Sequence, residues 1–238
     1  MFLGFKHIIE ELPPGDGDLD PPKDIDGRPL TAGVCFNWDI DQDFRLEVVQ
    51  EQDAFWKRLQ QHHGVRLTEG KTSEDVVNWL KKPKLENQIL YFFCHAESRS
   101  LDRGGPDSSA IELTGGKQTT LRYFKLKAPA DRFKLAGSPL VFINGCQSAS
   151  MSPLFYDGWV PYFLAKGARG VMGPVWDIPA VFASEWAIRL FNRLVEGPPI
   201  GEAMLWLRRE FLLKHNNLLG LAYSLYCDGE TRIHPALR

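Results

Sequence analysis

Short apolar runs alternate along the chain with segments in which apolar residues recur at the spacing of a helix. The runs that predict strands are residues 33–36, 64–67, 88–94, 139–144, 170–173 and 221–226, and the segments that predict helices are residues 44–63, 72–80, 159–165, 180–195 and 200–213. A hairpin is predicted at residues 109–116. Residues 88–94 are apolar at nearly every position, as in a central strand covered on both faces. This alternation predicts the α/β class, with a mainly parallel central sheet and helices on both faces.

The start of the chain differs in composition from the rest. Residues 13–29 concentrate prolines, glycines and five aspartates, which turns and linkers favour and a packed helix does not. We therefore predict an N-terminal arm and linker over residues 1–29 and one domain over residues 30–238. The composition fits both the tail of a preceding segment and an arm that packs back onto the domain.

Composition and charge narrow the classes of function. The chain has 238 residues, 44% of them hydrophobic, so it can bury a sizeable core. Its 28 basic and 30 acidic residues leave a formal charge of -2, which predicts no nucleic-acid partner. The longest apolar runs are too short to cross a bilayer and the N-terminus lacks the pattern of a secretory signal. We predict no membrane partner and a cytoplasmic location.

The cysteines do not have the spacing of a disulfide framework or a zinc site. Four of them, Cys35, Cys94, Cys146 and Cys227, are scattered without a CxxC pair. No HExxH or comparable metal-binding spacing is present. We predict reduced thiols, no metal and no cofactor.

Two residues with catalytic chemistry follow predicted central strands. His95 comes directly after the strand at residues 88–94, and Cys146 follows the strand at residues 139–144 across Gly145. Functional groups of open parallel sheets gather beyond the carboxyl ends of the strands. If these strands are neighbours, they lie about 4.8 Å apart, and the imidazole and thiol approach hydrogen-bonding distance. The placement predicts a dyad with Cys146 as nucleophile and His95 as general base.

Simpler interpretations exist for each residue alone. A lone His after a strand is most often a satisfied polar group, and a lone Cys is most often a small core residue. The spacing of His95 and Cys146 matches the separation of about 50 residues between the catalytic His and Cys of caspases. Gly145 permits a sharp turn that presents the thiol and its backbone N–H to a cleft. Cys94 is predicted to be core, because strand alternation points it away from His95.

Five segments together carry a family resemblance. They are residues 93–95, 141–148, 163–171, 175–177 and 200–204. In this order they resemble CHAT domains, caspase-like modules of the clan that also holds caspases, separase, gingipain and legumain. The resemblance covers residues 30–233 and implies a caspase-like three-layer sandwich.

The resemblance implies hydrolysis of peptide bonds through a thioester acyl-enzyme formed on Cys146, with His95 transferring protons. Backbone N–H groups of Ala96 and Cys146 would hold the oxyanion. The family usually has Gly directly after the catalytic His, and here Ala96 stands there. The oxyanion hole then requires backbone dihedrals that a residue with a Cβ tolerates.

The resemblance also places substrate-binding residues after the strand at residues 170–173. Trp176 is expected to form a wall of the cleft, and the acid that the family often carries four residues later is replaced by Ala180. The apolar neighbourhood of Ala180 predicts preference for an apolar or small residue before the scissile bond. Asp177 is the nearby acid, either turned into the pocket to favour a basic residue or serving as a solvated helix cap.

The implied context is cleavage of a specific partner protein in a prokaryotic antiviral defence or regulated-death pathway. A regulatory or sensor module in the same or a neighbouring polypeptide is expected as a further partner. The alternative is a non-catalytic caspase-like binding or scaffolding module, which the departures at Ala96 and Ala180 favour and the presence of His95 and Cys146 opposes.

Overall fold

The computed structural model describes residues 2–11, 24–27, 29–82, 86–99, 101–146 and 153–234, with backbone alone for residues 146 and 153–157. The strands are β1 Asp24–Asp26, β2 Thr31–Phe36, β3 Arg66–Gly70, β4 Ile89–Glu97, β5 Ala110–Leu113, β6 Lys117–Thr120, β7 Leu140–Cys146, β8 Gly170–Pro174, β9 Tyr223–Tyr226 and β10 Arg232–His234. The α-helices are α1 Asp39–Phe44, α2 Val48–His63, α3 Ser73–Lys81, α4 Leu121–Lys127, α5 Pro153–Ala165, α6 Ala180–Leu194 and α7 Ile200–His215.

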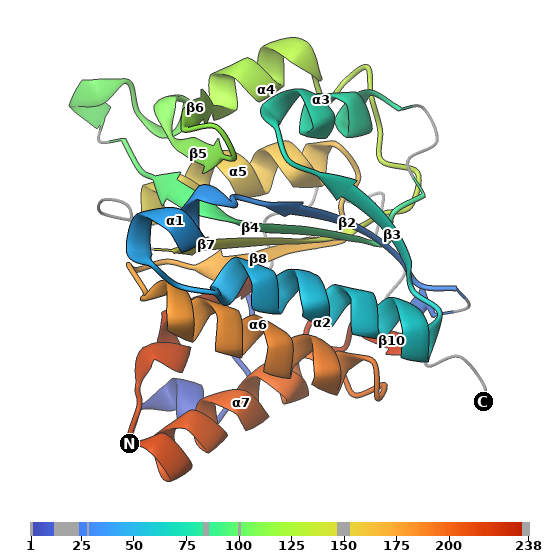
Figure 1. Cartoon of the computed structure of the whole chain (residues 1–238), viewed down its shortest axis with the longest axis vertical. Coiled ribbons are helices and arrows are strands. Elements are labelled where there is room, and N and C mark those ends of the chain that lie inside the picture. The colour runs from blue at the N-terminus through green and yellow to red at the C-terminus, as the bar shows by residue number, and fades with distance from the viewer. Residues whose placement is uncertain are drawn as a thin grey trace.

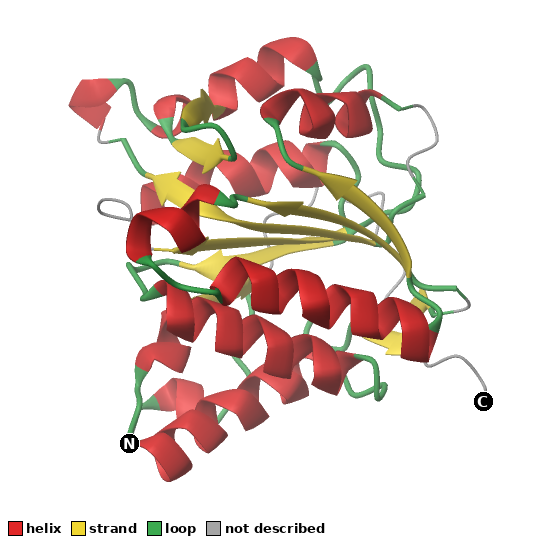
Figure 2. Ribbon diagram, viewed as in Figure 1, coloured by secondary structure: helices red, strands yellow, loops and turns green. Residues whose placement is uncertain are grey.

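The main sheet is built in the order β3-β2-β4-β7-β8-β9, with the hairpin β5–β6 attached to β4. Strands β3, β2, β4, β7 and β8 are parallel, while β9 runs antiparallel to β8 and β5 antiparallel to β4. Helices α3, α4 and α5 lie on one side of the sheet and α2, α6 and α7 on the other (Figures 1 and 2). The predicted α/β class, with helices on both faces, is confirmed.

Strand β4 shows why the central run is apolar throughout. Tyr91 and Phe93 belong to the hydrophobic cluster shared with α2, α6 and α7. Leu90 and Phe92 alternate with them and belong to the cluster on the opposite face, shared with α3, α4 and α5. Each position of residues 89–94 thus faces one of two apolar cores, which explains the continuous apolar run.

The predicted strand boundaries are too short at the carboxyl ends. Strand β4 continues through residues 95–97, because β5 pairs with them in antiparallel register. Strand β7 includes Gly145 and Cys146, and Gly145 lies in register with Cys94. The predicted turn at Gly145 is therefore wrong: pairing with β4 keeps the backbone extended to the nucleophile candidate.

The helix predicted over residues 44–63 begins only at residue 48, as α2, and the separate helix α1 precedes it. Helix α1 ends at Phe44, and Arg45 adopts a left-handed conformation with φ of 53°. The carboxylate of Asp41 then accepts hydrogen bonds from the N–H groups of Val49 (3.0 Å) and Gln50 (3.1 Å) at the start of α2. This side-chain cap stabilises the break between the helices.

The described parts of residues 1–29 pack against the rest of the chain. Phe5 and Ile25 are buried, and the guanidinium of Arg209 on α7 donates to the carbonyl of Phe5 (2.8 Å). Strand β1 pairs in parallel with β10, from Asp24 opposite Arg232 through residues 26 and 234. The described segments of the arm thus contribute to the core, while the domain boundary near residue 30 stays a prediction.

A buried lysine links α5 to the loop that precedes β7. The side chain of Lys166 is 0% exposed, and its ammonium donates to the carbonyls of Ala128 (3.2 Å) and Phe133 (2.7 Å). Burial, with the nearby ammonium of Lys134, lowers the pKa of Lys166 to about 8. The folded state therefore binds this proton less tightly than the unfolded chain does.

We expect this group to make the free energy of unfolding rise with pH above about 8, toward the ordinary lysine pKa of about 10.4. Below that window Lys166 is charged in both states and contributes no slope. Urea unfolding from pH 7 to 9.5 should show the wild type gaining up to about 1.4 kcal/mol per pH unit relative to Lys166→Met. Lys127→Met, at an exposed site, is the control and should follow the wild-type slope. Parallel curves for the wild type and Lys166→Met would contradict this account.

Candidate active site

The two predicted catalytic residues lie opposite each other on neighbouring strands. Strands β4 and β7 pair in parallel from Ile89 opposite Leu140 to His95 opposite Cys146. Residues in register on paired strands share one face of the sheet, with backbones about 4.8 Å apart. The prediction that these strands are neighbours is confirmed. The thiol of Cys146 lies outside the described atoms, so the dyad itself stays a prediction.

The imidazole of His95 occupies the edge of a core rather than open solvent. Its side chain is 5% exposed and lies on the face of β4 that also carries Tyr91 and Phe93. The ring of Phe44, at the end of α1, meets the imidazole edge to face, with centroids 5.7 Å apart and planes at 67°. Phe44 itself is 47% exposed.

Burial disfavours the thiolate at the other cysteines. Cys94 is fully buried in the cluster on the face opposite His95, as alternation predicted. Burial raises the pKa of the Cys35 thiol, an effect that Asp75 reinforces. Burial also raises the pKa of Cys227 to about 11. Because the thiolate is the nucleophilic form, these three sites are poor nucleophiles, and Cys146 is the remaining candidate.

A buried polar network anchors β7 two residues before Cys146. The side-chain amide of Asn144 donates to the Tyr91 hydroxyl (3.1 Å) and to the carbonyl of Ala183 on α6 (2.9 Å). The hydroxyl of Tyr223 on β9 donates to the amide oxygen of Asn144 (2.8 Å), and the hydroxyl of Tyr91 donates to Gln52 on α2 (2.9 Å). These bonds satisfy polar groups that would otherwise be costly to bury, and they connect the end of β7 to both helices.

The predicted oxyanion donor Ala96 lies within β4. Its Cβ is buried on the Cys94 face, and Ala96 is not among the described non-glycine residues with positive φ. The carbonyl of Phe93 accepts from the N–H of Asn37 on the β2 side (2.8 Å). Backbone groups alternate along a strand, so the N–H of Ala96 is directed toward β7. Alanine therefore replaces glycine without backbone strain, and its role as oxyanion donor stays a prediction.

The three predicted substrate-binding residues differ in accessibility. Trp176, two residues beyond the end of β8, is 57% exposed and Asp177 is also exposed. Ala180 is 6% exposed and lies in the core with Ile178. The apolar surroundings of Ala180 are therefore core rather than the lining of an open pocket. The N-cap position of α6 is occupied by Pro179, and Asp177 lies two residues before it.

Sequence reasoning missed Phe44 and Glu112 beside the base. Glu112 on β5 is the antiparallel partner of His95, which puts a carboxyl-bearing residue directly across from the imidazole. The hairpin that carries Glu112 was predicted without a pairing partner. Phe44 was predicted only as the first residue of the helix over residues 44–63, and the acidic cap at Asp41 was the signal that could have shown the break.

The described residues offer no assembled metal site and no membrane span. Within them, no three His, Cys, Asp or Glu side chains converge to hold a metal ion. No described helix has both the length and the apolarity needed to cross a bilayer.

The pattern of the CHAT domain matches residues 44–219 of the chain. The chain belongs to the CHAT family. It is 30% identical over 254 aligned residues to a probable protease of Vitiosangium sp. (strain GDMCC 1.1324), in a match that covers 96% of this chain and 30% of that protein. The chain thus spans less than a third of this relative's length.

Solved structures of the caspase-like clan resemble this CHAT domain. The separase of Saccharomyces cerevisiae, solved in complex with securin, is similar with a TM-score of 0.53 and 14% identity, over 87% of this chain and 12% of the separase chain. The Drosophila initiator caspase Dronc has a TM-score of 0.44 and 11% identity, over 85% of this chain and 82% of its own. The helices on both faces of the sheet and the similarity to separase confirm the predicted three-layer sandwich.

Removing the ring of Phe44 should loosen the His95 imidazole. In Phe44→Ala we expect the His95 ring resonances to shift in NMR spectra, because the ring-edge contact is lost. The free energy of unfolding should also fall, because an aromatic pair contributes about 0.5–1.5 kcal/mol beyond the area that its rings bury. Leu101→Ala, at another exposed apolar residue, should leave the His95 resonances in place. Unchanged resonances in Phe44→Ala would show that the contact does not orient the imidazole.

Proposed function

We propose that this CHAT domain is a cysteine endopeptidase with Cys146 as nucleophile and His95 as general base. The observation that carries the proposal is the backbone register that pairs these residues at the carboxyl edge of the parallel strands. Family membership and similarity to a relative named a probable protease support it.

In the proposed reaction, His95 accepts the thiol proton of Cys146 and the thiolate attacks the scissile carbonyl carbon. Backbone N–H groups near Ala96 and Cys146 stabilise the oxyanion of the tetrahedral intermediate. His95 then donates its proton to the amine as the C–N bond breaks, leaving a thioester. Water, deprotonated by His95, hydrolyses the thioester and releases the free thiol. This chemistry requires no cofactor.

The proposed substrate is a specific partner protein, and the proposed setting is prokaryotic defence or regulated death. This setting comes from the family resemblance. A regulatory or sensor module is the proposed second partner, in the same or a neighbouring polypeptide. The relative of which this chain spans 30% has length enough for further modules, which supports that arrangement.

A non-catalytic scaffold is the second candidate. Its support was two departures from the family pattern, the alanine that follows His95 in place of glycine and Ala180 in place of an acid. The extended backbone of Ala96 weakens that support, because the Cβ is accommodated without positive φ.

Cys146→Ala and His95→Ala should each reduce proteolysis by at least about a thousandfold while the protein stays folded, because each removes half of the nucleophile and base pair. Labelling by a thiol-directed peptide electrophile should disappear in Cys146→Ala. Cys94→Ala is the matched control, at a buried cysteine one strand away and on the other face, and should retain labelling and activity. Labelling that survives in folded Cys146→Ala and vanishes in Cys94→Ala would reverse the assignment. A folded wild type that resists every such electrophile would favour the scaffold.

Cleavage-site mapping with a peptide library should show an apolar or small residue before the scissile bond. Trp176 supplies an exposed apolar surface near the end of β8, and an apolar wall penalises an unpaired charge. Asp177→Ala should leave the preference unchanged, whereas Trp176→Ala should weaken it. Strong selection for Arg or Lys that is lost in Asp177→Ala would instead make Asp177 the specificity residue.

A further inference from the structure

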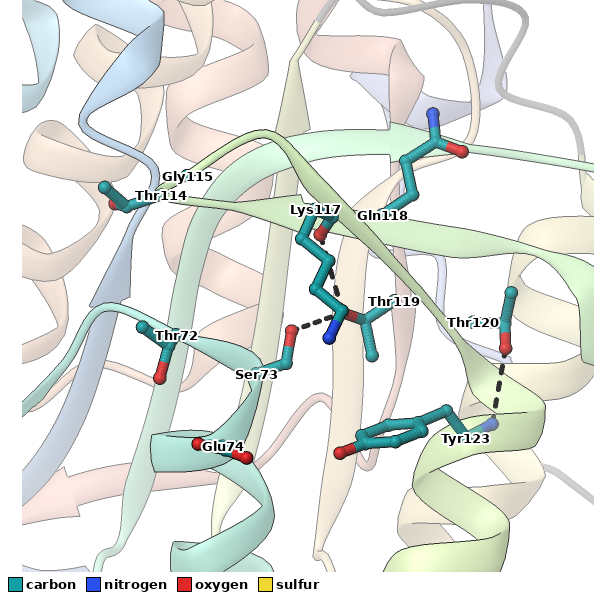
Figure 3. A pocket seen from close by; sticks show the side chains of 10 residues that line it. All are labelled: Thr72, Ser73, Glu74, Thr114, Gly115, Lys117, Gln118, Thr119, Thr120 and Tyr123. Atoms are coloured by element: carbon teal, nitrogen blue, oxygen red, sulfur yellow. Dashed lines mark hydrogen bonds between the residues drawn. The ribbon is translucent and has the colours of Figure 1, made fainter.

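A cavity follows the outer edge of the β5–β6 hairpin, on the side away from β5. Its volume is about 490 Å³, within the range of roughly 300–1,000 Å³ that ligand sites occupy. All four residues of β6 line it, together with residues 72–74 at the start of α3 and Tyr123 on α4 (Figure 3). No residue of β5 contributes to the lining. The cavity therefore runs along the edge of β6 that faces away from the sheet.

The backbone of β6 presents a donor and an acceptor to this space. The N–H of Leu121 donates to the carbonyl of Ser109 (2.9 Å). This bond shows which backbone groups of β6 face β5 and which face away from it. Because backbone groups alternate along a strand, the N–H and carbonyl of Thr119 face β5 and those of Gln118 face away from it. Among the described strands, β6 pairs with β5 alone. The N–H and carbonyl of Gln118 thus form an open strand edge that adjoins a cavity.

The walls of the cavity are polar and carry both charges. The hydroxyl groups of Ser73 on α3 and Thr119 on β6 contact each other (Figure 3). The side chain of Lys117 extends toward Ser73 (Figure 3). Glu74 and the ring of Tyr123 also line the cavity. An extended polypeptide matches this site, because its backbone offers the alternating N–H and carbonyl groups that a strand edge binds. Its side chains would alternate between these walls and solvent.

The hairpin is held rigidly enough to serve as a template. Backbone N–H groups of Gly115 and Gly116 in its turn donate to the carboxylate of Asp39 (2.7 and 3.0 Å). The hydroxyl of Thr114 donates to the carbonyl of Phe36 at the end of β2 (2.9 Å). A fixed edge lowers the ordering cost of adding a strand.

We propose that the open edge of β6 binds an extended segment of a partner protein as an added strand. Since β5 pairs with residues 95–97 of β4, the added strand would lie three strands, or about 14 Å, from the strand that carries His95. The idea that this segment belongs to a substrate rests on the proposed peptidase function. Binding at the edge does not require catalysis.

The test compares two substitutions at one position. A library of random linear peptides is selected on Cys146→Ala, which removes the proposed nucleophile, and affinities are measured for this protein and two further variants. Adding Gln118→Pro deletes the outward N–H, which an edge strand tolerates. Adding Gln118→Ala keeps the N–H and, like proline, removes the contact with Arg99 (3.5 Å). We expect the selected peptides to bind at least about tenfold more weakly to the proline variant than to Cys146→Ala itself. The alanine variant should bind them as tightly as Cys146→Ala does.

Hydrogen exchange on the protein without proline supplies an independent measurement. The amide of Gln118 should exchange quickly in the free protein and slow at least tenfold, by about 1.4 kcal/mol, with a selected peptide. Failure to select any peptide, or equal affinity for the proline and alanine variants, would overturn the proposal. So would a Gln118 amide already protected in the free protein, since another segment would then occupy the edge.

Electrophile labelling separates this proposal from the peptidase proposal. Wild type and Gln118→Pro should be labelled equally at Cys146, because a short electrophile does not reach the β6 edge. Loss of labelling in both proteins would contradict the peptidase proposal and leave the peptide-binding result standing. Loss in Gln118→Pro alone would show that proline disturbs β4, and exchange at Gln118 would then decide the docking proposal.

Discussion

The parallel pairing of β4 with β7 is the constraint on which the candidate site depends. It brings residues distant in sequence into register and continues to His95 opposite Cys146. A register shift by one residue would move every side chain of β7 to the other face. That change would bury Asn144 among apolar residues and break its bonds to α6 and β9. Packing on both faces and one buried polar network thus specify the same alignment.

Two elements near the site contact His95 or the strand that carries it. Strand β5 extends β4 past the apolar run and keeps His95 within regular structure rather than in a loop. The helix break at Arg45, stabilised by the carboxylate of Asp41, places Phe44 against the imidazole. The position of His95 is therefore set by backbone pairing, and an aromatic neighbour from a different segment packs against its ring.

The apolar run at residues 88–94 was sufficient to predict a central strand, because double-sided burial leaves a continuous signature in sequence. The same signature could not predict where β4 ends. Residues 95–97 are held by β5, which belongs to a predicted hairpin whose sequence does not indicate the strand that it pairs with. Gly145 was misjudged for the same reason: glycine permits a turn, but pairing with Cys94 keeps it extended. Ala180 looked like pocket lining because local apolarity does not distinguish a cleft from the core.

The pairing of β1 with β10 has a mechanical consequence. The described chain enters this pair at Asp24 and leaves it at His234, and the two strands run in the same direction. Tension between those points would load the hydrogen bonds of the pair together in shear, rather than opening them one after another as in a zipper. Tension applied between Asp24 and His234 would thus load this pair before the strands that carry His95 and Cys146.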